Sequence, residues 1–191
     1  METLDRLLET LENISGTLRL DGSESDISIL KGLIKEHSTS DLDLNKYHLD
    51  PADKPYGRNI LVNNGKVEVV FLSWGPDQIC DVHDHGESCG LVKVVKGNIS
   101  NIIYQEDTVS GEPIHQQEEY VLDDIFIEVP KNSWHQMKNN LDEFSYTLHV
   151  YAPPVTDMQV FDKENKQLVT VDENCGAWLS EPDRQIKIKK L

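Results

Sequence analysis

The chain has 191 residues, enough for one domain with a substantial hydrophobic core. Its net charge of -16 at pH 7 argues against nucleic acid or an anionic membrane surface as a partner, because both would repel it. The apolar runs are too short to span a membrane. The start METLDRLLETLEN carries acids and lacks a small-residue cleavage site, so we expect no signal peptide. The three cysteines lack zinc-like spacing, which favours reduced thiols in a cytoplasmic protein.

Apolar residues at helical spacing predict amphipathic helices at the start of the chain. The first covers residues 2–14 and the second residues 26–37, with Ser23 or Ser25 as its N-terminal cap. A short third helix is expected over residues 40–47. These helices carry no pattern typical of catalysis, and we expect them to pack against a sheet.

From Tyr56 onward the hydrophobic pattern changes to short extended runs. The segment NILVNNGKVEVVFLSW predicts a hairpin with a two-residue turn at Asn64-Gly65. Further strands are expected in LVKVV, ISNIIY, EEYVL, IFIEVP, SYTLHVYA, MQVF and QLVTV. The basic end EPDRQIKIKKL is expected to form an edge strand, in which lysines discourage pairing with another sheet. The fold class is therefore mainly β, an antiparallel barrel or sandwich with an N-terminal α-helical appendage.

His83 and His85 lie two residues apart in the stretch SWGPDQICDVHDHGESCG. On an extended strand both side chains would project from one face. His135 lies further along, after a Pro-Lys-Asn turn, and could join them from a distant strand. Three imidazoles suit Fe, Zn, Cu or Ni and leave coordination positions open for a substrate. The alternative for H-x-H alone is a solvent-facing histidine pair.

The spacing around these histidines resembles the two motifs of the cupin proteins. The pattern H-x-H-x4-G-x6-G begins at His83, and D-x5-P-x-N-x2-H-x3-N begins at Asp124. Gly90 replaces the usual glutamate of the first motif, which leaves three neutral histidines. Asp124 and Asn132 replace two glycines of the second motif, and both residue types tolerate left-handed backbone.

Two other fragments carry candidate binding residues. Arg58, in PYGRNIL, lies beside a strand expected to face inward, and its planar guanidinium suits a carboxylate. A surface arginine is the alternative. In SYTLHVYAPP, Thr147, His149 and Tyr151 share one strand face, where a chain of hydrogen bonds would fix the phenol. A satisfied polar patch in the core is the alternative.

Taken together, these fragments resemble the cysteine dioxygenases, a thiol dioxygenase family within the cupins. The matching pieces are Y-x-R-N from Tyr56, W-G at Trp74, H-D-H, K-x-x-x-G-N from Lys93, the third histidine, and L-H-V-Y-A-P-P from Leu148. The resemblance covers about residues 56–161. It implies a cupin jelly-roll barrel.

With that resemblance, we expect a single cupin domain over residues 1–191. It would comprise a helical region over 1–50, a barrel core over 56–175 and a C-terminal tail over 176–191.

The resemblance implies oxidation of L-cysteine to cysteine sulfinate by dioxygen at ferrous iron, Fe(II). The residues implied are the metal ligands His83, His85 and His135, the catalytic residues Tyr151, His149 and Thr147, and the substrate contacts Arg58, Tyr56, Trp74 and Met158. Arg58 would anchor the substrate carboxylate, and the phenol of Tyr151 would lie near the substrate. We expect a cytoplasmic monomer that takes a small thiol and O2, with no nucleic acid or membrane partner.

One departure from the animal members concerns a covalent bond. Those members carry a cysteine at the place of Gly90, cross-linked to the tyrosine equivalent to Tyr151. Gly90 has no thiol, and Cys89 is expected to face the opposite side of its strand. We therefore predict no cysteine–tyrosine cross-link, as in bacterial-type members.

Other functions are compatible with the same residues. A dioxygenase for another small thiol acid, such as 3-mercaptopropionate, is the nearest alternative, although Arg58 favours cysteine because members that prefer the amine-free acid differ there. A non-catalytic metal-binding or sensing cupin, and a zinc or manganese cupin acting as a Lewis acid, are the others. The general order of metal affinities favours metals other than iron, so iron follows from the resemblance alone.

Overall fold

A computed structural model describes residues 3–13, 23–37, 42–122 and 125–191. The helices come first: α1 (Thr3–Glu12), α2 (Glu24–Lys35) and α3 (Leu44–Tyr47). The strands that follow are β1 (Tyr56–Asn63), β2 (Glu68–Trp74), β3 (Cys89–Lys96), β4 (Asn98–Glu106), β5 (Pro113–Leu122), β6 (Phe126–Val129), β7 (Trp134–Asn139), β8 (Ser145–Ala152), β9 (Gln159–Asp162), β10 (Gln167–Val171) and β11 (Gln185–Lys190). A 3-10 turn, Pro182–Arg184, precedes β11. In the described part of the chain, no helix is long and apolar enough to cross a membrane.

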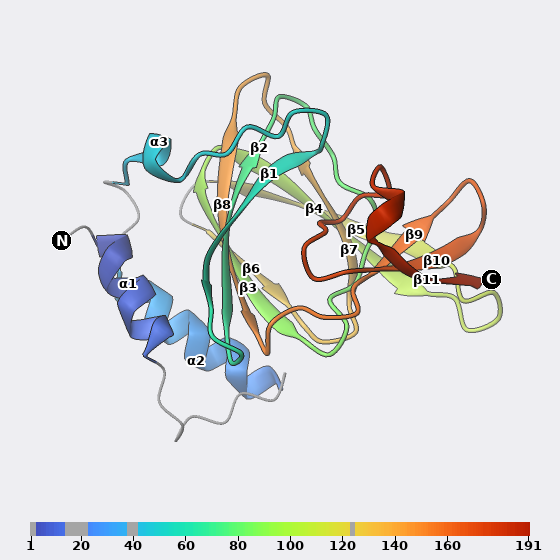
Figure 1. The fold of residues 1–191 in the computed structure, drawn as a ribbon, viewed down its shortest axis with the longest axis horizontal. Coiled ribbons are helices and arrows are strands. Elements are labelled where there is room, and N and C mark those ends of the chain that lie inside the picture. Colours follow the sequence, from blue (N-terminus) through green and yellow to red (C-terminus); the bar gives the residue numbers. More distant parts are fainter. Residues whose placement is uncertain (1–2, 14–22, 38–41, 123–124) are drawn as a thin grey trace.

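The strands form an antiparallel barrel, as the sequence predicts. One sheet has the order β1-β2-β8-β3-β6, a second β5-β4-β7 and a third β11-β10-β9 (Figure 1). Buried side chains from all three sheets, among them Val70, Ile99 and Val169, belong to one hydrophobic cluster. The principal core therefore lies inside the barrel.

The helices cover the outer face of the five-stranded sheet. Leu4 and Leu7 of α1 and Leu30 and Ile34 of α2 are fully buried and share a second cluster with Phe71 of β2. In Figure 1 both helices lie along the side of the barrel formed by β1, β2, β8 and β3, opposite the C-terminal strands. The expected packing of the helices against a sheet is confirmed.

Strand β2 is consequently buried along its whole length. Val69 and Phe71 belong to the outer cluster under the helices, whereas Val70 and Leu72 belong to the cluster inside the barrel. Covering both faces explains why EVVFLSW is almost continuously apolar. Alternation along the strand also places Glu68 on the inner face, two residues before Val70.

The helix ends differ in detail from the expectations. The segment expected over residues 2–14 is α1, Thr3–Glu12, and both expected ends lie outside the described residues. Ser23 occupies the N-cap position of α2, but its hydroxyl bonds to Ser25 Oγ at 2.7 Å instead of capping the helix. The third helix is one turn, Leu44–Tyr47, and the expected start at residue 40 lies outside the described residues.

The β1–β2 hairpin is present, but the predicted two-residue turn is wrong. The last strand pair is Asn63 with Glu68, so four residues form the connection. The side-chain oxygen of Asn64 accepts hydrogen bonds from the backbone N–H groups of Lys66 and Val67, both at 3.0 Å. These bonds stabilise a wider loop, in which Gly65 takes a φ of +79°.

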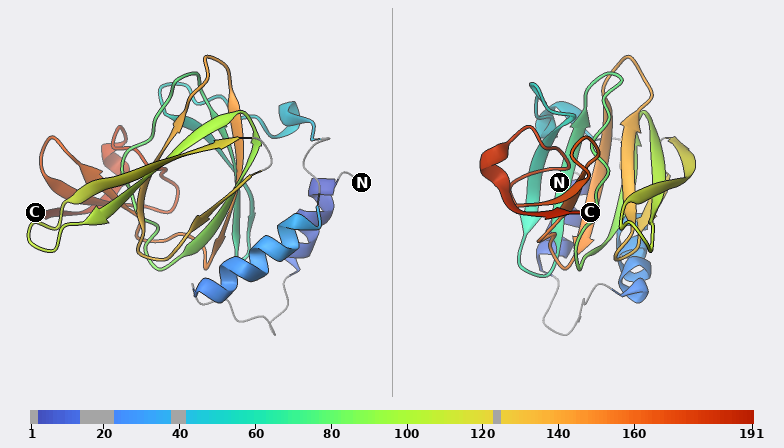
Figure 2. Two further views of the ribbon diagram at one scale, coloured as in Figure 1. Left: turned by 180° about the vertical axis from the view of Figure 1, so that it is seen from behind. Right: turned by 90° about the vertical axis from the view of Figure 1, so that its right-hand side faces the viewer.

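The C-terminal strands lie at the far side of the barrel. Strand β11 is the exposed edge of its sheet, which confirms the expectation for the lysine-rich tail. The long hairpin β4–β5 extends from the barrel toward these strands (Figure 2, left). There Lys166 Nζ lies 3.0 Å from a carboxylate oxygen of Glu112.

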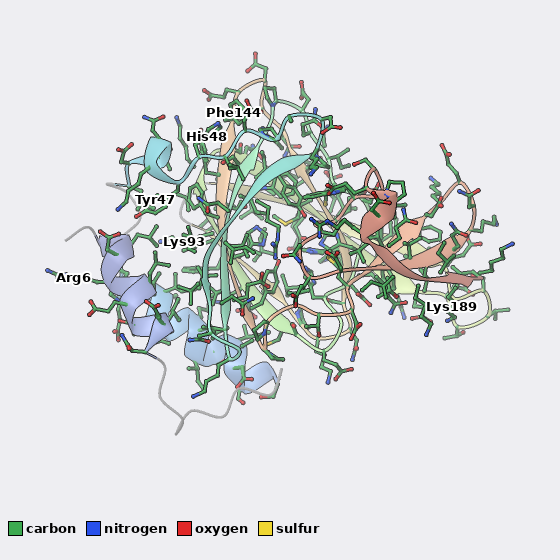
Figure 3. The ribbon with its side chains drawn as sticks, in the orientation of Figure 1. Arg6, Tyr47, His48, Lys93, Phe144 and Lys189 are labelled. Atoms are coloured by element: carbon green, nitrogen blue, oxygen red, sulfur yellow. The ribbon has the colours of Figure 1, made fainter. Side chains whose placement is uncertain are left out.

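Aromatic side chains pack the segment around α3 against the outer face of the five-stranded sheet. His48 and Phe144 meet edge to face with ring centroids 5.0 Å apart, and Tyr47 packs against Phe71 at 5.7 Å (Figure 3). The connection from the helices into the barrel is thus fixed to the same sheet that α1 and α2 cover.

Truncation of a side chain that packs between the helices and the sheet should destabilise the protein. Leu30→Ala removes a fully buried side chain, and we expect the free energy of unfolding to fall by about 2–5 kcal/mol. Ile188→Ala on exposed β11 is the control and should change it by less than about 1 kcal/mol. Urea unfolding of both variants measures the difference, and equal losses would show that the helices contribute little to stability.

Candidate metal centre and substrate pocket

Three histidines converge inside the barrel. One ring nitrogen from each of His83, His85 and His135 lies within 4.8 Å of the other two, and all three side chains are buried. The backbones of His83 and His135 bond to each other through two N–H···O contacts of 2.9 Å. This reciprocal pair brings together two segments that are far apart in the sequence.

The segment through His83 and His85 is not a regular strand, although it is bridged to strands on both sides. His83 is an isolated bridge residue between His135 and Val160, and the chain turns at Gly86, whose φ is +56°. The carboxylate of Asp84 causes this turn, since it accepts from Gly86 N at 3.2 Å and from Gln159 N at 2.8 Å. The two imidazoles therefore point the same way, as expected, from a segment held between β7 and β9.

The protonation of these histidines suits metal binding. Nδ1–H of His83 donates to the carbonyl of Asp81, and Nδ1–H of His135 donates to Asn101 Oδ1, each at 2.9 Å. These bonds leave Nε2 of both rings as the electron-pair donor. Burial lowers the pKa of His83 to about 4 and the pKa values of His85 and His135 well below the usual value, so all three are neutral at pH 7.

Two ring nitrogens in this cluster lack a hydrogen-bond partner. Within the part of the chain that the structure describes, His135 Nε2 and His85 Nδ1 are the buried side-chain polar atoms with no such partner. Leaving a buried nitrogen unsatisfied is costly unless something else binds it. Neutral imidazoles with unsatisfied nitrogens fit a divalent transition metal.

A second polar group runs along the inner face of β8. Thr147 Oγ lies 2.8 Å from His149 Nε2, and His149 Nδ1 lies 2.8 Å from the Tyr151 hydroxyl. The hydroxyl in turn lies 3.3 Å from His85 Nε2. The predicted chain of Thr147, His149 and Tyr151 is thus present, and it ends at the histidine cluster.

Trp74 sets the direction of this chain. Its indole N–H, which can only donate, bonds to Thr147 Oγ at 2.8 Å. Because His149 Nε2 is the one possible acceptor among the described partners of the Thr147 hydroxyl, the Thr147 proton goes to His149 Nε2, and His149 Nδ1–H then donates to the Tyr151 oxygen. Burial lowers the pKa of His149 to about 3 and raises the pKa of Tyr151 well above its usual value. The phenol therefore keeps its proton and can donate it away from His149.

A pocket opens beside the histidines. Tyr151, His83, His85 and His149 line it together with Arg58, Glu68 and Met158. Arg58 Nη2 donates to Glu68 Oε1 at 2.5 Å, and Glu68 Oε2 accepts from Val155 N at 3.2 Å. The sequence analysis named Arg58 but not Glu68. The signal for Glu68 was a single acid inside the apolar run VEVVFLSW.

The remaining expected substrate contacts occupy different places. Met158 lines the pocket. Tyr56 also lines it, but its hydroxyl accepts from Ala177 N at 2.8 Å and its ring packs 4.6 Å from that of Trp74. Trp74 is almost fully buried behind Thr147 and is not among the described residues that line the pocket.

Gly90 faces Tyr151 directly across the β3–β8 pair. A Cβ atom at this position would lie 2.6 Å from the Tyr151 ring, too close without a shift of the ring. Cys89 lies in the outer cluster under the helices, where its thiol donates to Ala152 O at 3.4 Å. Its expected orientation is confirmed, and the absence of a cross-link to Tyr151 stays a prediction.

The second cupin motif shows one of its expected features. Asn132 has a φ of +60°, the left-handed conformation expected where the usual motif has glycine. Asp124, the other replacement, lies outside the described residues.

Comparisons with known proteins agree with this geometry. A family model described as cysteine dioxygenase type I matches residues 18–164. Cysteine dioxygenase type 1 of Bos taurus is 28% identical over 135 residues, which cover 63% of this chain and 64% of the relative. The enzyme of the same name from Danio rerio is 23% identical over 181 residues, which cover 89% of this chain and 84% of the relative. The chain thus spans slightly less than two thirds of the bovine relative.

A solved structure supports the fold. An uncharacterized conserved protein with a double-stranded β-helix domain from Klebsiella pneumoniae superimposes with a TM-score of 0.50 at 15% identity, over 62% of this chain and 88% of that one. At this identity the likeness concerns the barrel alone. Because the family model covers most of the chain, including all three histidines, the protein belongs to the cysteine dioxygenase type I family of cupins.

Proposed function

We propose that this protein is an iron-dependent thiol dioxygenase that oxidises L-cysteine to cysteine sulfinic acid. The observation that carries the proposal is the convergence of three neutral, buried histidines, two of which, His83 and His85, line a pocket together with Tyr151 and Arg58. The reaction adds both atoms of dioxygen to the sulfur, so that R–SH and O2 give R–SO2H without a further reductant. Membership of the cysteine dioxygenase family supports this substrate and this reaction.

His83, His85 and His135 would hold the iron. A ferrous ion bound by neutral ligands keeps its positive charge, attracts the thiolate form of the substrate and supplies the redox chemistry that dioxygen requires. Asn101 orients His135 and the Asp81 carbonyl orients His83, so both are positioning groups. The Asp84 turn fixes His85 relative to His83.

Arg58 would bind the substrate carboxylate. Only Nη2 of its guanidinium bonds to Glu68, and the other donors remain for a second carboxylate. The side chain is 15% exposed, so a contact here is largely shielded from water. Holding the carboxylate orients the thiol toward the histidines, and this orientation lowers the entropic cost of reaction.

Tyr151 would donate a hydrogen bond to the bound substrate. With His149 donating to its oxygen, the phenol proton is directed toward the histidine cluster, where His85 Nε2 lies 3.3 Å away. Thr147, His149 and Trp74 act through Tyr151 and are positioning residues. Met158 contributes an apolar wall.

Oxygen uptake with a panel of thiols tests the function. The protein is loaded with iron anaerobically and mixed with O2 and L-cysteine, 3-mercaptopropionate or cysteamine. We expect one O2 consumed per L-cysteine and a product 32 mass units heavier, the mass of two oxygen atoms. A non-catalytic metal-binding cupin would keep its iron and consume no O2 with any of these thiols.

Removal of a ligand should abolish iron binding. His135→Ala deletes one of three ligands and should leave no retained iron, whereas Asn101→Ala should weaken iron binding by about 10–100-fold because His135 loses its orienting partner. Metal analysis after gel filtration and competition with a chelator measure both effects. His115→Ala on exposed β5 is the control and should bind iron like the wild type. Full iron retention in His135→Ala would contradict the assignment.

Replacement of Arg58 should separate substrate binding from chemistry. In Arg58→Ala we expect the KM for L-cysteine to rise by about two to three orders of magnitude, since breaking a buried charge pair costs about 2–5 kcal/mol. Iron content should stay unchanged. Cysteamine lacks the carboxylate, so it should be a poor substrate of the wild type and hardly poorer for the variant.

Two controls accompany this experiment. Arg6→Ala removes an arginine that projects from α1 away from the barrel (Figure 3) and should leave both substrates unaffected. Because Arg58→Ala also leaves Glu68 without its cation, thermal melting of the variant reports any loss of folding. If Arg58→Ala has the wild-type KM for L-cysteine, or loses as much turnover with cysteamine as with L-cysteine, Arg58 is structural.

A further inference from the structure

The pocket beside the histidines has an acidic mouth, formed by Asp157 and Glu173. Both side chains are exposed, and every other described residue that lines the pocket is buried or half-buried. His83 and His85 line the pocket as buried side chains. Carboxylates and imidazoles are both ligands of divalent metals. The pocket therefore joins solvent to the histidine cluster and carries metal-binding side chains at both ends.

The backbone brings the two acids together and close to the cluster. Val171 N bonds to Met158 O at 3.0 Å and continues the pairing of β9 with β10. Asp157 precedes Met158 and Glu173 follows Val171 closely, so the acids lie on adjacent segments. The chain at Asp157 also passes Gly86, where an added Cβ atom would lie 3.7 Å from the Asp157 carbonyl carbon. Gly86 directly follows the second of the three histidines.

Only part of the negative charge around the pocket is neutralised. Four carboxylates line the pocket. Glu68 pairs with Arg58, and Asp172 pairs with an arginine at 3.1 Å. Within the described part of the chain, the carboxylates of Asp157 and Glu173 form neither a hydrogen bond nor an ion pair. In the metal-free protein the mouth therefore carries a net negative charge.

Glu173 is the less opposed of the two acids. Lys187 and Lys189 of β11 line a neighbouring hollow together with Asp157, and their charges offset part of its field. Glu173 acts toward the interior of the pocket: burial raises the pKa of Glu68, and the charge of Glu173 adds to that rise. We therefore expect Glu173 to contribute more than Asp157 to attraction of a cation.

The histidines alone cannot draw a cation from solvent. His85 is 2% exposed, lines the pocket and has a ring nitrogen, Nδ1, without a hydrogen-bond partner among the described residues. A neutral imidazole has no net charge, so its attraction for a cation is short-ranged. A carboxylate attracts a divalent cation over a longer distance. Imidazole is the preferred ligand of iron and zinc, so a cation held at the mouth gains by moving inward.

We propose that Asp157 and Glu173 form an entry site for divalent metal cations, which captures the cation at the mouth of the pocket and passes it to the three histidines. The site differs from the histidine centre in position and in ligand chemistry. The inference rests on the proposed role of the histidines as metal ligands, but it concerns uptake of the metal and not oxidation of a thiol.

The rate of metal uptake by the metal-free protein tests the proposal. Stopped-flow absorbance follows Co2+, whose visible spectrum changes when imidazoles replace water. In the double variant Asp157→Asn/Glu173→Gln we expect the association rate constant to fall by about tenfold at low ionic strength. At about 1 M salt, where charges are screened beyond about 3 Å, the difference from the wild type should disappear. The amount of Co2+ bound at saturation should stay the same, because the three histidines remain.

The substitutions are chosen to preserve the fold. Asn tolerates the left-handed backbone that residue 157 adopts, with a φ of +55°. Glu173→Gln alone changes one exposed side chain, and it should produce most of the loss in rate even if the double variant does not fold. An association rate in Glu173→Gln equal to that of the wild type overturns the proposal.

A matched control removes the same charge far from the pocket. Glu9 and Glu12 are exposed on α1, on the side of the barrel opposite the C-terminal strands (Figure 1). The variant Glu9→Gln/Glu12→Gln should take up Co2+ at the wild-type rate. A loss equal to that of the mouth variant would show that only the net charge of the chain matters, which also overturns the proposal.

Oxygen uptake separates this inference from the proposed function. If the iron-loaded protein oxidises no thiol but the mouth variant takes up Co2+ slowly, the proposed reaction fails and the entry site stands. If oxidation is normal and the wild type and the mouth variant take up Co2+ at the same rate, the entry site fails alone. A wild-type protein that binds no Co2+ would overturn both the histidine centre and the entry site.

Discussion

The backbone pairing between His83 and His135 is the contact on which the site depends. Its two hydrogen bonds join the loop after β2 to the start of β7. The bonds from Cys80 N to Met137 O and from Asn139 N to Gln78 O continue the same pairing, so the loop runs along β7 over several residues. A second bridge, from His83 to Val160, and the bonds from Asp84 to Gln159 tie the same loop to β9. Metal ligands held by backbone hydrogen bonds and by a buried carboxylate require little rearrangement on binding.

Strand β2 connects the helices to the site. Its outer face packs under α1 and α2, and its inner face carries Glu68 toward the pocket and the Trp74 indole toward Thr147. The next strand, β8, presents Thr147, His149 and Tyr151 on the same inner side. The helices carry no catalytic residue, but their burial of the outer face fixes the two strands that carry the polar groups.

The sequence predicts those parts of the site that follow from local periodicity. Thr147, His149 and Tyr151 share a face because β8 is a regular strand, and Cys89 faces away from Tyr151 for the same reason. Periodicity could not foresee the turn at Gly86, because it depends on contacts of Asp84 with β9. The contact of Glu68 with Arg58 was missed because the strand register pairs Arg58 with Leu72 and Glu68 with Asn63, so the two side chains meet only across the inside of the barrel.

Electrostatics act on a substrate at two ranges in this protein, through the net charge of the chain and through Arg58 in the pocket. The chain carries a net charge of -16, so an amine-free thiol acid approaches against a repulsive field, whereas zwitterionic cysteine has no net charge to be repelled. Salt screens this field over about 8 Å at physiological ionic strength. The Arg58–Glu68 pair is shielded from water inside the barrel, where screening is weak. Repulsion by the surface field would decrease with added salt, whereas the contact of a substrate carboxylate with Arg58 would persist, so the salt dependence of KM distinguishes the two contributions.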